Sequence, residues 1–328
     1  MDIMLKGIEM PVTRDEVLWG YRMILGREPE SEEAILRHLS ASDRHTLRTD
    51  FLGCPEFAKL HSGQAKNEFR TLPIDLPKIE VDTAADDSQL SECISKISAA
   101  WRHLGSIKPH FSVLTNTSFL PDKLPETIDR FWGSGEKEAK ELDIILGRHE
   151  FGLLSDKTCV EYGCGVGRVT MGLARRFEKV HAYDISLPHL SIAQERAKEI
   201  RADNVEFHLC SEGVNTPLHE CDVFFSILVF QHNPPPVIGI MIGNALRSLR
   251  PGGIAIFQVP TYRIAYRFKT DEWLALPNTM DMEMHCFPQP VIFEIIGREN
   301  CVPLEIREIA QKARNKHISN LFVIRKIA

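Results

Sequence analysis

The sequence lacks an apolar run of the length that a membrane span needs. A transmembrane helix takes about 20 mainly apolar residues, and no stretch of this chain approaches that length. Residues 1–6 carry an acid and precede no long apolar core, so they do not resemble a secretory signal. We therefore expect a protein that has no membrane span and works in the cytoplasm.

Paired cysteines and an excess of positive charge are missing too. The eight cysteines are scattered without a C-x-x-C pair, which favours buried free thiols in a reducing compartment over disulfides or structural zinc. The sequence contains no convincing cluster of metal-ligating residues, so no metal site is expected. The formal net charge of −6 does not draw the whole molecule to nucleic acid or anionic lipid, so we expect no nucleic-acid partner.

Three regions of the chain differ in composition. Residues 1–65 are typical of helices: Thr13 and Glu16 form a capping box, and apolar residues follow at helical spacing. Residues 66–95 combine proline with acidic side chains and few apolar ones, which is typical of a linker. Residues 96–328 then form a larger domain. The sequence therefore predicts a small N-terminal all-helical module, a linker and one large domain.

Strands and helices alternate in the larger domain from about residue 155 onward. This alternation indicates an α/β fold with a parallel sheet and helices on both faces. The expected strands cover residues 158–161, 180–183, 205–209, 222–229, 254–259, 303–307 and 320–325. A long insertion at 262–290 follows the fifth of these strands, and such insertions commonly form a lid over a substrate.

A glycine-rich turn follows the first strand of this domain. A strand, a tight glycine turn and a helix together make a nucleotide site, because the backbone can approach the ligand closely. Dinucleotide enzymes use G-x-G-x-x-G. This turn instead has its glycines at Gly163, Gly165 and Gly167. Arg168 stands where the dinucleotide pattern has its third glycine, so the spacing disfavours a dinucleotide.

Two acids flank this turn. Glu161 ends the first strand, where a carboxylate suits the cationic end of an amino-acid-like ligand and would repel pyrophosphate. Asp184 ends the second strand, 21 residues after Gly163, where an acid typically binds both hydroxyls of a ribose. Together they favour a ligand with a cationic amino-acid end and a ribose.

These landmarks resemble those of the class I S-adenosylmethionine-dependent methyltransferases. The resemblance rests on Glu161-x-Gly-x-Gly-x-Gly167, on Ala182-Tyr-Asp184-Ile-Ser and on Leu249-Arg-Pro-Gly-Gly253 before a strand. It covers about residues 125–328. It implies a Rossmann-like methyltransferase sheet of seven strands, mostly parallel with one antiparallel strand. It also implies methyltransferase activity, with S-adenosylmethionine bound across the strand ends.

The resemblance further implies roles for individual residues. The glycines would shape the methionine pocket, Asp184 would hold the ribose, and Ile185 would pack on the adenine. Residues 132–136 resemble the segment that covers the methionine end in some family members. The cofactor-binding residues expected on this basis are Trp132, Gly135, Glu161, Gly163, Cys164, Gly165, Gly167, Arg168, Asp184, Ile185, Ser211, Glu212, Ile227 and Leu228.

The candidate catalytic residues are two histidines, because a nearby base helps methyl transfer to a hydroxyl. His232 lies just beyond the fourth strand, near the expected position of the methyl group, and His285 lies in the insertion. His232 could equally cap a helix or contact the substrate. Tyr262 and Tyr266, also in the insertion, are candidate substrate-binding residues.

One segment resembles a motif of a different methyltransferase class. Asn233-Pro-Pro-Pro236 invites comparison with the Asn-Pro-Pro-aromatic motif of enzymes that methylate amino groups in DNA, RNA or glutamine. Its fourth residue is proline, which cannot stack on a base as an aromatic ring does. It also begins 11 residues after Asp222, later than is usual for the motif. A small-molecule acceptor therefore fits this segment better than a nucleic acid.

The N-terminal module resembles a small helical domain, related in pattern to phycobilisome linker segments, that accompanies bacterial glycan-assembly enzymes. The resemblance rests on Leu-Gly-Arg-x-Pro within residues 21–30 and on residues 51–57. It implies a sugar O-methyltransferase of bacterial glycan or lipopolysaccharide biosynthesis, with a glycan or other small-molecule acceptor. The module's candidate partner is then a glycan-assembly protein. A small-molecule or lipid-amine N-methyltransferase and a non-catalytic scaffold are the alternatives.

Overall fold

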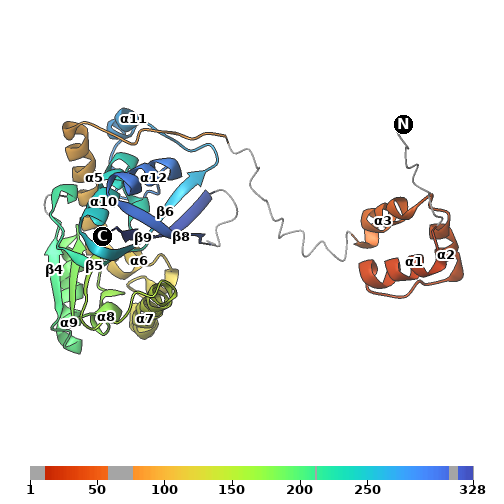
Figure 1. The fold of residues 1–328 in the computed structure, drawn as a ribbon, viewed down its shortest axis with the longest axis horizontal. Helices are drawn as coiled ribbons and strands as arrows, with labels where there is room; N and C mark the ends of the chain where they lie inside the picture. The colour runs from red at the N-terminus through yellow and green to blue at the C-terminus, as the bar shows by residue number, and fades with distance from the viewer. Residues whose placement is uncertain (1–11, 58–76, 211–212, 310–316, 328) are drawn as a thin grey trace. The chain divides into compact units, whose positions relative to one another are not determined.

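The structure is a computed structural model, and it describes residues 12–57, 77–210, 213–309 and 317–327. The chain separates into two compact units, Met1–Leu72 and Pro73–Ala328. The division falls inside the span 66–95 that the composition indicates as a linker. Figure 1 shows the helices of the first unit and the central sheet of the second.

The first unit is built from helices around a small apolar core. Its described helices are α1 (Arg14–Gly20), the π-helical turn η1 (Tyr21–Leu25), α2 (Glu32–Leu39) and α3 (Arg44–Gly53). The expected capping box is present, because the Thr13 hydroxyl accepts from the Glu16 N–H and the Glu16 carboxylate accepts from the Thr13 N–H. Phe51 is buried in the core, and a side chain on Gly20 would collide with its ring.

The second unit is organised around a seven-stranded sheet. Its strands are β2 (Thr158–Tyr162), β3 (Lys179–Asp184), β4 (Val205–Leu209), β5 (Cys221–Ser226), β6 (Leu249–Arg263), β8 (Cys301–Glu308) and β9 (His317–Lys326). They lie in the order β4-β3-β2-β5-β6-β9-β8. Strand β9 runs antiparallel to both of its neighbours, β6 and β8, and the other neighbouring pairs of described strands in this sheet are parallel. The expected Rossmann-like sheet, mostly parallel with one antiparallel strand, is confirmed.

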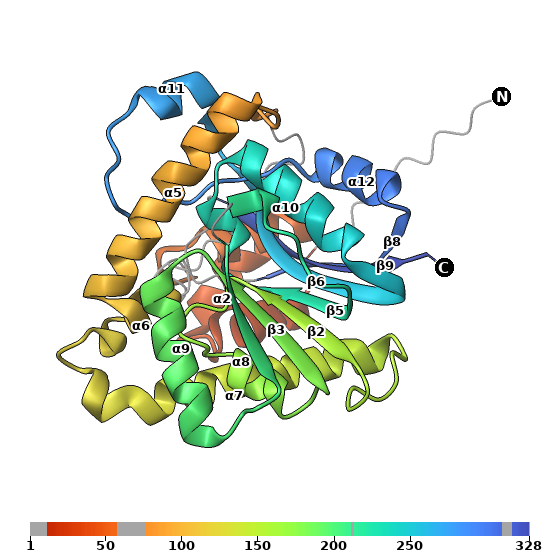
Figure 2. The same ribbon diagram turned by 90° about the vertical axis from the view of Figure 1, so that its left-hand side faces the viewer.

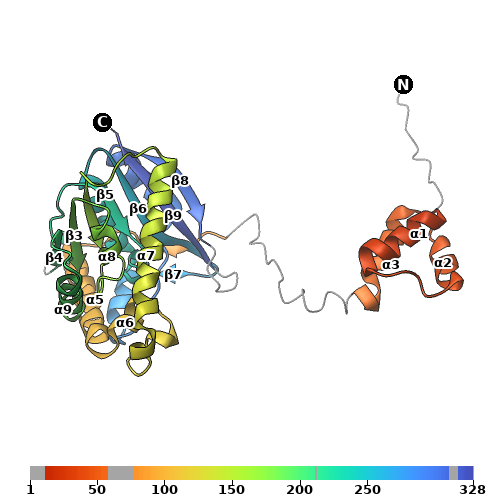
Figure 3. The ribbon, with the colours of Figure 1, turned by 90° about the horizontal axis from the view of Figure 1, so that it is seen from below.

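Helices cover both faces of this sheet. They are α5 (Asp87–Ile107), α6 (Pro109–Val113), α7 (Leu124–Arg148), α8 (Thr170–Ala174), α9 (Leu187–Ile200), α10 (Pro235–Arg247), α11 (Thr270–Ala275) and α12 (Gln289–Arg298). Successive strand residues point to opposite faces. Val160 and Phe224 therefore pack with α5, α10 and α12, whereas Cys159 and Phe225 pack with α7 and α8. Figures 2 and 3 show these helix layers on opposite sides of the sheet.

The strand β5 ends earlier than expected. The apolar run predicts a strand over residues 222–229, but the strand stops at Ser226. Leu228 has a φ of 63°, a left-handed conformation that a strand does not accommodate. The Leu228 N–H donates to the side chain of Gln258 on β6 at 3.0 Å instead of continuing the sheet. The chain therefore turns away at the edge where ligands bind in open α/β sheets.

Part of the span 66–95 belongs to the second unit and its insertion. The short strand β1 (Glu80–Val81) pairs in parallel with β7 (Arg267–Phe268), and α5 begins at Asp87. The Lys96 ammonium on α5 donates to the carbonyls of residues 273, 274 and 276, at 3.1, 2.8 and 2.7 Å. The segment after residue 77 is thus anchored to the insertion. The linker that the composition predicts, 66–95, therefore includes residues that belong to the second unit. The domain bounds otherwise stay a prediction.

Candidate functional site

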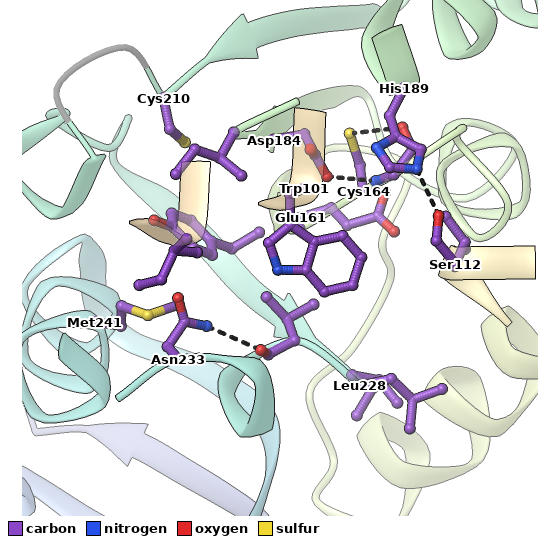
Figure 4. Close-up of a pocket in the computed structure, with 18 of the residues that line it drawn as sticks. Trp101, Ser112, Glu161, Cys164, Asp184, His189, Cys210, Leu228, Asn233 and Met241 are labelled. Atoms are coloured by element: carbon purple, nitrogen blue, oxygen red, sulfur yellow. Dashed lines mark hydrogen bonds between the residues drawn. The ribbon is translucent and has the colours of Figure 1, made fainter. Parts of the chain in front are cut away.

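A cavity opens at the carboxyl edge of the sheet, where β2, β3 and β5 end. It holds about 1010 Å³ of empty space, including the part open to solvent. Helices α5, α6, α9 and α10 contribute to its lining together with the glycine turn, and Figure 4 shows part of that lining. The predicted cofactor-binding residues that line it are Glu161, Gly163, Cys164, Gly165, Arg168, Asp184, Ile185, Ile227 and Leu228.

The glycine turn has no room for side chains at two positions. Gly163 has a φ of 79°, and a Cβ there would lie 2.4 Å from the Val229 Cγ2. Gly165 has a φ of 55°, and a Cβ there would lie 2.5 Å from the Val113 Cγ2. Both the backbone conformation and the close neighbours therefore require glycine. The Gly163 N–H also donates to the Tyr183 carbonyl at 2.8 Å, which ties the turn to β3.

Asp184 lies at the end of β3 with its carboxylate held by two backbone donors. Oδ2 accepts from the Gly165 N–H and Oδ1 from the Ser186 N–H, each at 2.8 Å. Burial raises the pKa of Asp184, and the nearby His189 and the backbone donors oppose that shift. Each carboxylate oxygen has two lone pairs, so both oxygens can still accept a bond from a ligand.

Glu161 is a buried carboxyl group at the end of β2. The Thr170 hydroxyl donates to its Oε2 at 2.5 Å, and no described residue donates to Oε1. Burial raises the pKa of Glu161 to about 7, while the Thr170 bond and Arg168 act in the opposite direction. A cation that entered the cavity would stabilise the charged form of this group.

Arg168 brings a buried positive charge to the same end of the cavity. Its Nη1 donates to the Ser134 hydroxyl at 3.3 Å, and its Nη2 lies 3.9 Å from a carboxylate oxygen of Glu138. Its Nε is buried with no hydrogen-bond partner among the described residues. Burial lowers the pKa of Arg168, against the attraction of Glu138 and Glu161. An orphaned guanidinium donor of this kind suits a ligand carboxylate.

Several lining residues carry no motif in the sequence. Trp101 comes from α5, Ser112 from α6, His189 from α9 and Met241 from α10. The Ser112 hydroxyl and the His189 Nε2 are 2.8 Å apart, which joins α6 to α9 beside Asp184 (Figure 4). These residues belong to four separate helices, so a short spacing pattern does not reveal them.

Three predicted cofactor-binding residues do not line this cavity. Gly167, with a φ of 82°, lies against Met171 in the turn. Gly135 lets α7 approach the glycine turn, since a Cβ there would lie 1.7 Å from the Arg168 carbonyl oxygen. Trp132 carries the Arg196 guanidinium over its ring at 4.9 Å and faces a separate surface cavity.

Residues 132–136 belong to a continuous helix packed behind the turn, and the predicted contact of Trp132 and Gly135 with the cofactor stays a prediction. The predicted adenine contacts Ser211 and Glu212 lie outside the described residues. Their neighbour Cys210 does line the cavity and donates its N–H to the Asp184 carbonyl at 2.8 Å.

His232 is not among the cavity-lining residues. Its Nδ1 donates to the Glu283 carbonyl at 2.8 Å, and its Nε2 lies 3.1 Å from the Gln231 amide nitrogen. Its ring packs edge-on against Trp101, whose indole does line the cavity, with centroids 5.2 Å apart. Burial lowers the pKa of His232 to about 4. The imidazole is therefore neutral at pH 7 and sits one layer behind the cavity wall.

His285 is buried in the insertion, away from the cavity lining. Its Nδ1 is 3.0 Å from the Tyr266 hydroxyl, and its Nε2 is 3.2 Å from a Glu283 carboxylate oxygen. Tyr266 is buried in this cluster, and Tyr262 donates to the Pro77 carbonyl at 3.0 Å. Tyr266 and His285 thus contact each other within the insertion, whereas Tyr262 joins the insertion to the segment before β1. The His285 Nε2 lies near the Glu283 carboxylate but makes no hydrogen bond with good geometry among the described residues. The catalytic and substrate-binding roles of these residues stay predictions.

A second cavity adjoins the first at the residues 225, 227 and 228. It lies between α7 and the ends of β5, β6 and β9. Its walls are mostly apolar, and its charged lining residues are Glu138, Glu141, Arg307 and Glu308. Leu228, with its left-handed backbone, lines both cavities. Such strained residues cluster at functional sites.

Comparisons with known proteins agree with this fold. The sequence model of the methyltransferase domain family matches residues 159–253. A ubiquinone biosynthesis O-methyltransferase of Hydrogenovibrio crunogenus is 27% identical over 110 residues, which cover 33% of this chain and 44% of that protein. The chain thus matches less than half of the length of this relative.

Two solved structures were compared with this chain, and the first of them shares its fold. A magnesium protoporphyrin IX methyltransferase from Synechocystis PCC 6803, with bound S-adenosylmethionine, has a TM-score of 0.50 and 15% identity, covering 75% of this chain and 100% of that one. The N-methyltransferase NodS from Bradyrhizobium japonicum WM9, with bound S-adenosylhomocysteine, has a TM-score of 0.47 and 15% identity, covering 70% and 98%.

The described part of the chain has no helix with the length and apolar character of a membrane span. The family match begins inside β2 and ends at Gly253, where the buried run of β6 starts, so it contains the glycine turn, Asp184 and the end of β5. Residues 159–253 match the methyltransferase domain family, and the larger unit has the fold of an S-adenosylmethionine-dependent methyltransferase of known structure.

Proposed function

We propose that the protein binds S-adenosylmethionine in the cavity at the carboxyl edge of the sheet and methylates a hydroxyl group of a sugar. The observation that carries the binding step is the pair of carboxylates, Glu161 and Asp184, at the ends of neighbouring strands of one cavity. S-adenosylmethionine supplies a methyl group on a sulfonium, which a nucleophile attacks in line. The protein's own groups bind, orient and deprotonate.

The polar groups fit the two ends of this ligand. Glu161 would bind the ammonium group and Arg168 the carboxylate of the methionine part, since the Arg168 Nε has no other partner among the described residues. Asp184 would accept both ribose hydroxyls with its remaining lone pairs. Ile185 and Met241 supply apolar surface for the adenine. Each of these assignments uses a group that the cavity wall already presents.

The second cavity is our proposed acceptor site. It meets the first at Ile227 and Leu228, beside the end that carries Glu161 and Arg168. An acceptor there would approach the methionine end rather than the adenine end. Leu228 would then separate the two ligands, and its N–H bond to Gln258 holds it in its left-handed conformation.

Glu138 is our proposed base. It lines the second cavity, and burial raises its pKa against the opposing charge of Arg168. A carboxylate with a raised pKa is a stronger base, which matters for a hydroxyl, a poor nucleophile at neutral pH. The catalytic role of His232 and His285 stays a prediction. In this proposal the two histidines position the insertion and do not contact the reacting atoms.

The sugar acceptor is supported by the resemblance of the N-terminal unit to modules of glycan assembly. An amine acceptor is the second candidate, and the carboxylates of Glu138, Glu141 and Glu308 in the second cavity favour it. A non-catalytic scaffold is the candidate from another class. The three candidate functions differ in whether a methyl group is transferred and in whether oxygen or nitrogen accepts it.

The test is a product assay with S-adenosylmethionine and two acceptor panels, sugars with free hydroxyls and small or lipid amines. We expect release of S-adenosylhomocysteine with the sugars, and a mass increase of one methyl group on the product. Glu138→Gln should lower turnover at least about tenfold while S-adenosylhomocysteine affinity is unchanged, because a positioned base contributes about 10²–10⁴. Glu126→Gln, at an exposed position of the same helix outside both cavities, is the matched control and should retain turnover.

Methylation of amines alone would overturn the hydroxyl assignment. Equal turnover in Glu138→Gln and the parent would remove Glu138 as the base. Absence of transfer to every acceptor together with absence of S-adenosylhomocysteine binding, in a folded protein, would favour the scaffold.

A further inference from the structure

Three imidazoles and one carboxylate converge at the β3–β4 edge of the sheet, outside both cavities. His181 lies on β3, Glu206 and His208 lie on β4, and His219 lies in the segment before β5. One ligand atom from each of the four lies within 4.8 Å of each of the others. The register His181↔Glu206 and Tyr183↔His208 places the strand residues on one face. The sequence predicted no metal site, because these residues are separated along the chain.

We propose that His181, Glu206, His208 and His219 bind one divalent transition-metal ion of the zinc type. This proposal is independent of the methyl-transfer function. Zinc prefers imidazole nitrogen and carboxylate oxygen in a tetrahedral arrangement, with bonds of about 2.0–2.2 Å. Such bonds set neighbouring ligand atoms about 3.3 Å apart.

The separations among His181, Glu206 and His208 match that spacing, and the ligand atom of His219 lies within 4.8 Å of theirs. The His181 Nδ1 is 3.1 Å from the His208 Nε2 and 3.3 Å from the Glu206 Oε2. The His219 ring stacks on the His181 ring with centroids 3.8 Å apart and planes 3° apart. Neutral imidazoles are the form that binds a metal. Because the two rings are parallel, their in-plane lone pairs do not yet point at one position, so binding requires one ring to rotate about its side-chain torsions.

Groups around the cluster orient its ligands. The Tyr183 hydroxyl donates to the Pro217 carbonyl at 3.3 Å, and its oxygen lies 2.6 Å from the His219 Nδ1. With that hydroxyl hydrogen directed at Pro217, the His219 Nδ1 carries the proton that it shares with Tyr183. The lone pair of His219 is then on Nε2, which is available for a metal. Bonds of this kind fix the tautomer of ligating histidines in known metal sites.

A lysine next to the cluster binds the other oxygen of its carboxylate. The Lys179 ammonium binds the Glu206 Oε1, which leaves the Oε2 that faces His181. The positive charge of Lys179 offsets the negative charge of Glu206, which weakens the attraction of this carboxylate for a cation. The three imidazoles would therefore supply most of the binding energy. This donor set favours zinc and its neighbours over magnesium or calcium, which prefer oxygen.

The test is a Zn²⁺ titration of the full chain, freed of any histidine tag, against a chromogenic zinc indicator. Absorption of Co²⁺-loaded protein provides the second readout, because tetrahedral Co²⁺ has intense visible bands. We expect one ion per chain and tetrahedral bands. His208→Gln and His219→Gln should each weaken Zn²⁺ binding at least about tenfold. His103→Gln, an exposed histidine on α5, is the matched control and should bind as the parent does.

Circular dichroism and S-adenosylhomocysteine titration check that each variant is folded, and His219 is exposed, so its replacement is not expected to unfold the chain. Equal Zn²⁺ affinity in the parent and both cluster variants would place the metal on other groups and overturn the proposal. Magnesium binding at the cluster in preference to zinc, or no Zn²⁺ binding at all, would overturn it as well.

Discussion

The carboxylate of Asp184 accepts a hydrogen bond from the backbone N–H of Gly165 at 2.8 Å. This bond joins the end of β3 to the turn that follows β2, so one side chain both supports the glycine turn and faces the cavity. The residue that the proposal assigns to the ribose is therefore also part of the frame that shapes the methionine end. Removal of the Asp184 carboxylate should therefore affect both ligand binding and the stability of the glycine turn, and these two effects can be measured separately.

Asp184→Ala should weaken S-adenosylhomocysteine binding by about 2–4 kcal/mol, which is about 30- to 1000-fold, because charge-assisted bonds to two hydroxyls are lost. Asp184→Asn should retain more stability, since its amide oxygen can still accept from one backbone donor. Isothermal titration gives the affinity and thermal unfolding gives the stability. Unchanged affinity in a folded Asp184→Ala protein would mean that this residue does not hold the ligand.

Gly163→Ala should lower the free energy of unfolding more than Gly252→Ala does. Both glycines have a φ of 79°, so both substitutions carry the cost of a left-handed residue, about 1–2 kcal/mol. A Cβ at Gly252 has no neighbour within 4 Å, whereas one at Gly163 meets Val229 at 2.4 Å. Urea unfolding measures the free energy of unfolding of both variants, and we expect Gly163→Ala to lose about 1–3 kcal/mol more than Gly252→Ala.

Cofactor affinity separates the same two variants. Gly252→Ala should bind S-adenosylhomocysteine as the parent does, because Gly252 lies outside the cavity lining. Gly163→Ala should lose most of its binding, since its Cβ displaces the turn. Equal stability and equal binding in the two variants would show that the close approach at Gly163 is unimportant.

The affinity for S-adenosylhomocysteine should rise between pH 6 and pH 8. Burial raises the pKa of Glu161 to about 7, so the unliganded protein carries a proton there at pH 6. A bound ammonium favours the carboxylate, so binding at pH 6 must release that proton and is weaker. Glu161→Gln should bind more weakly at pH 8 and lose the pH dependence. A parent profile that is flat over this range would remove Glu161 as the ammonium ligand.

The raised pKa of Glu161 also predicts how the free energy of unfolding changes with pH. A carboxyl whose pKa is higher in the folded state favours folding below its unfolded pKa, near 4.3, and this contribution is lost as the pH rises through about 7. The Gln side chain of Glu161→Gln does not ionise, so the variant does not lose stability in this way as the pH rises. The difference in unfolding free energy between variant and parent should therefore move in favour of the variant from pH 5 to pH 8.

His232→Asn should retain most turnover, whereas His232→Ala should not. The Asn side chain can still donate to the Glu283 carbonyl, as the His232 Nδ1 does at 2.8 Å. A positioning role requires only that bond, while a base requires the imidazole. Steady-state kinetics with the accepted substrate measures both variants. An equal loss of kcat in both would restore His232 as a catalytic base.

Local patterns predicted the parts of the site that lie at strand ends. Glu161, Gly163 and Asp184 sit within or beside short buried strands, and their spacing follows from the strand–turn–helix geometry that parallel sheets share. The same geometry predicted the order of strands and helices from residue 155 onward. Only the placement of these residues in one cavity needed the three-dimensional structure.

Contacts between distant segments were not predictable in this way. Trp101, Ser112 and His189 reach the cavity from helices whose sequences show only an ordinary apolar face. Trp132 lies on a helix beside the glycine turn but does not line the cavity, and its sequence pattern does not reveal which way that helix faces. The sequence did not indicate the cluster of His181, Glu206, His208 and His219, because its members come together through strand register, which a single sequence does not display.

Calorimetric titration of the purified full chain with S-adenosylhomocysteine, with NAD as a parallel control, tests the central claim most directly. The account predicts one site of micromolar affinity for S-adenosylhomocysteine and no binding of NAD. Binding of NAD instead, or no binding of either ligand by folded protein, would contradict the assignment of the cavity to S-adenosylmethionine.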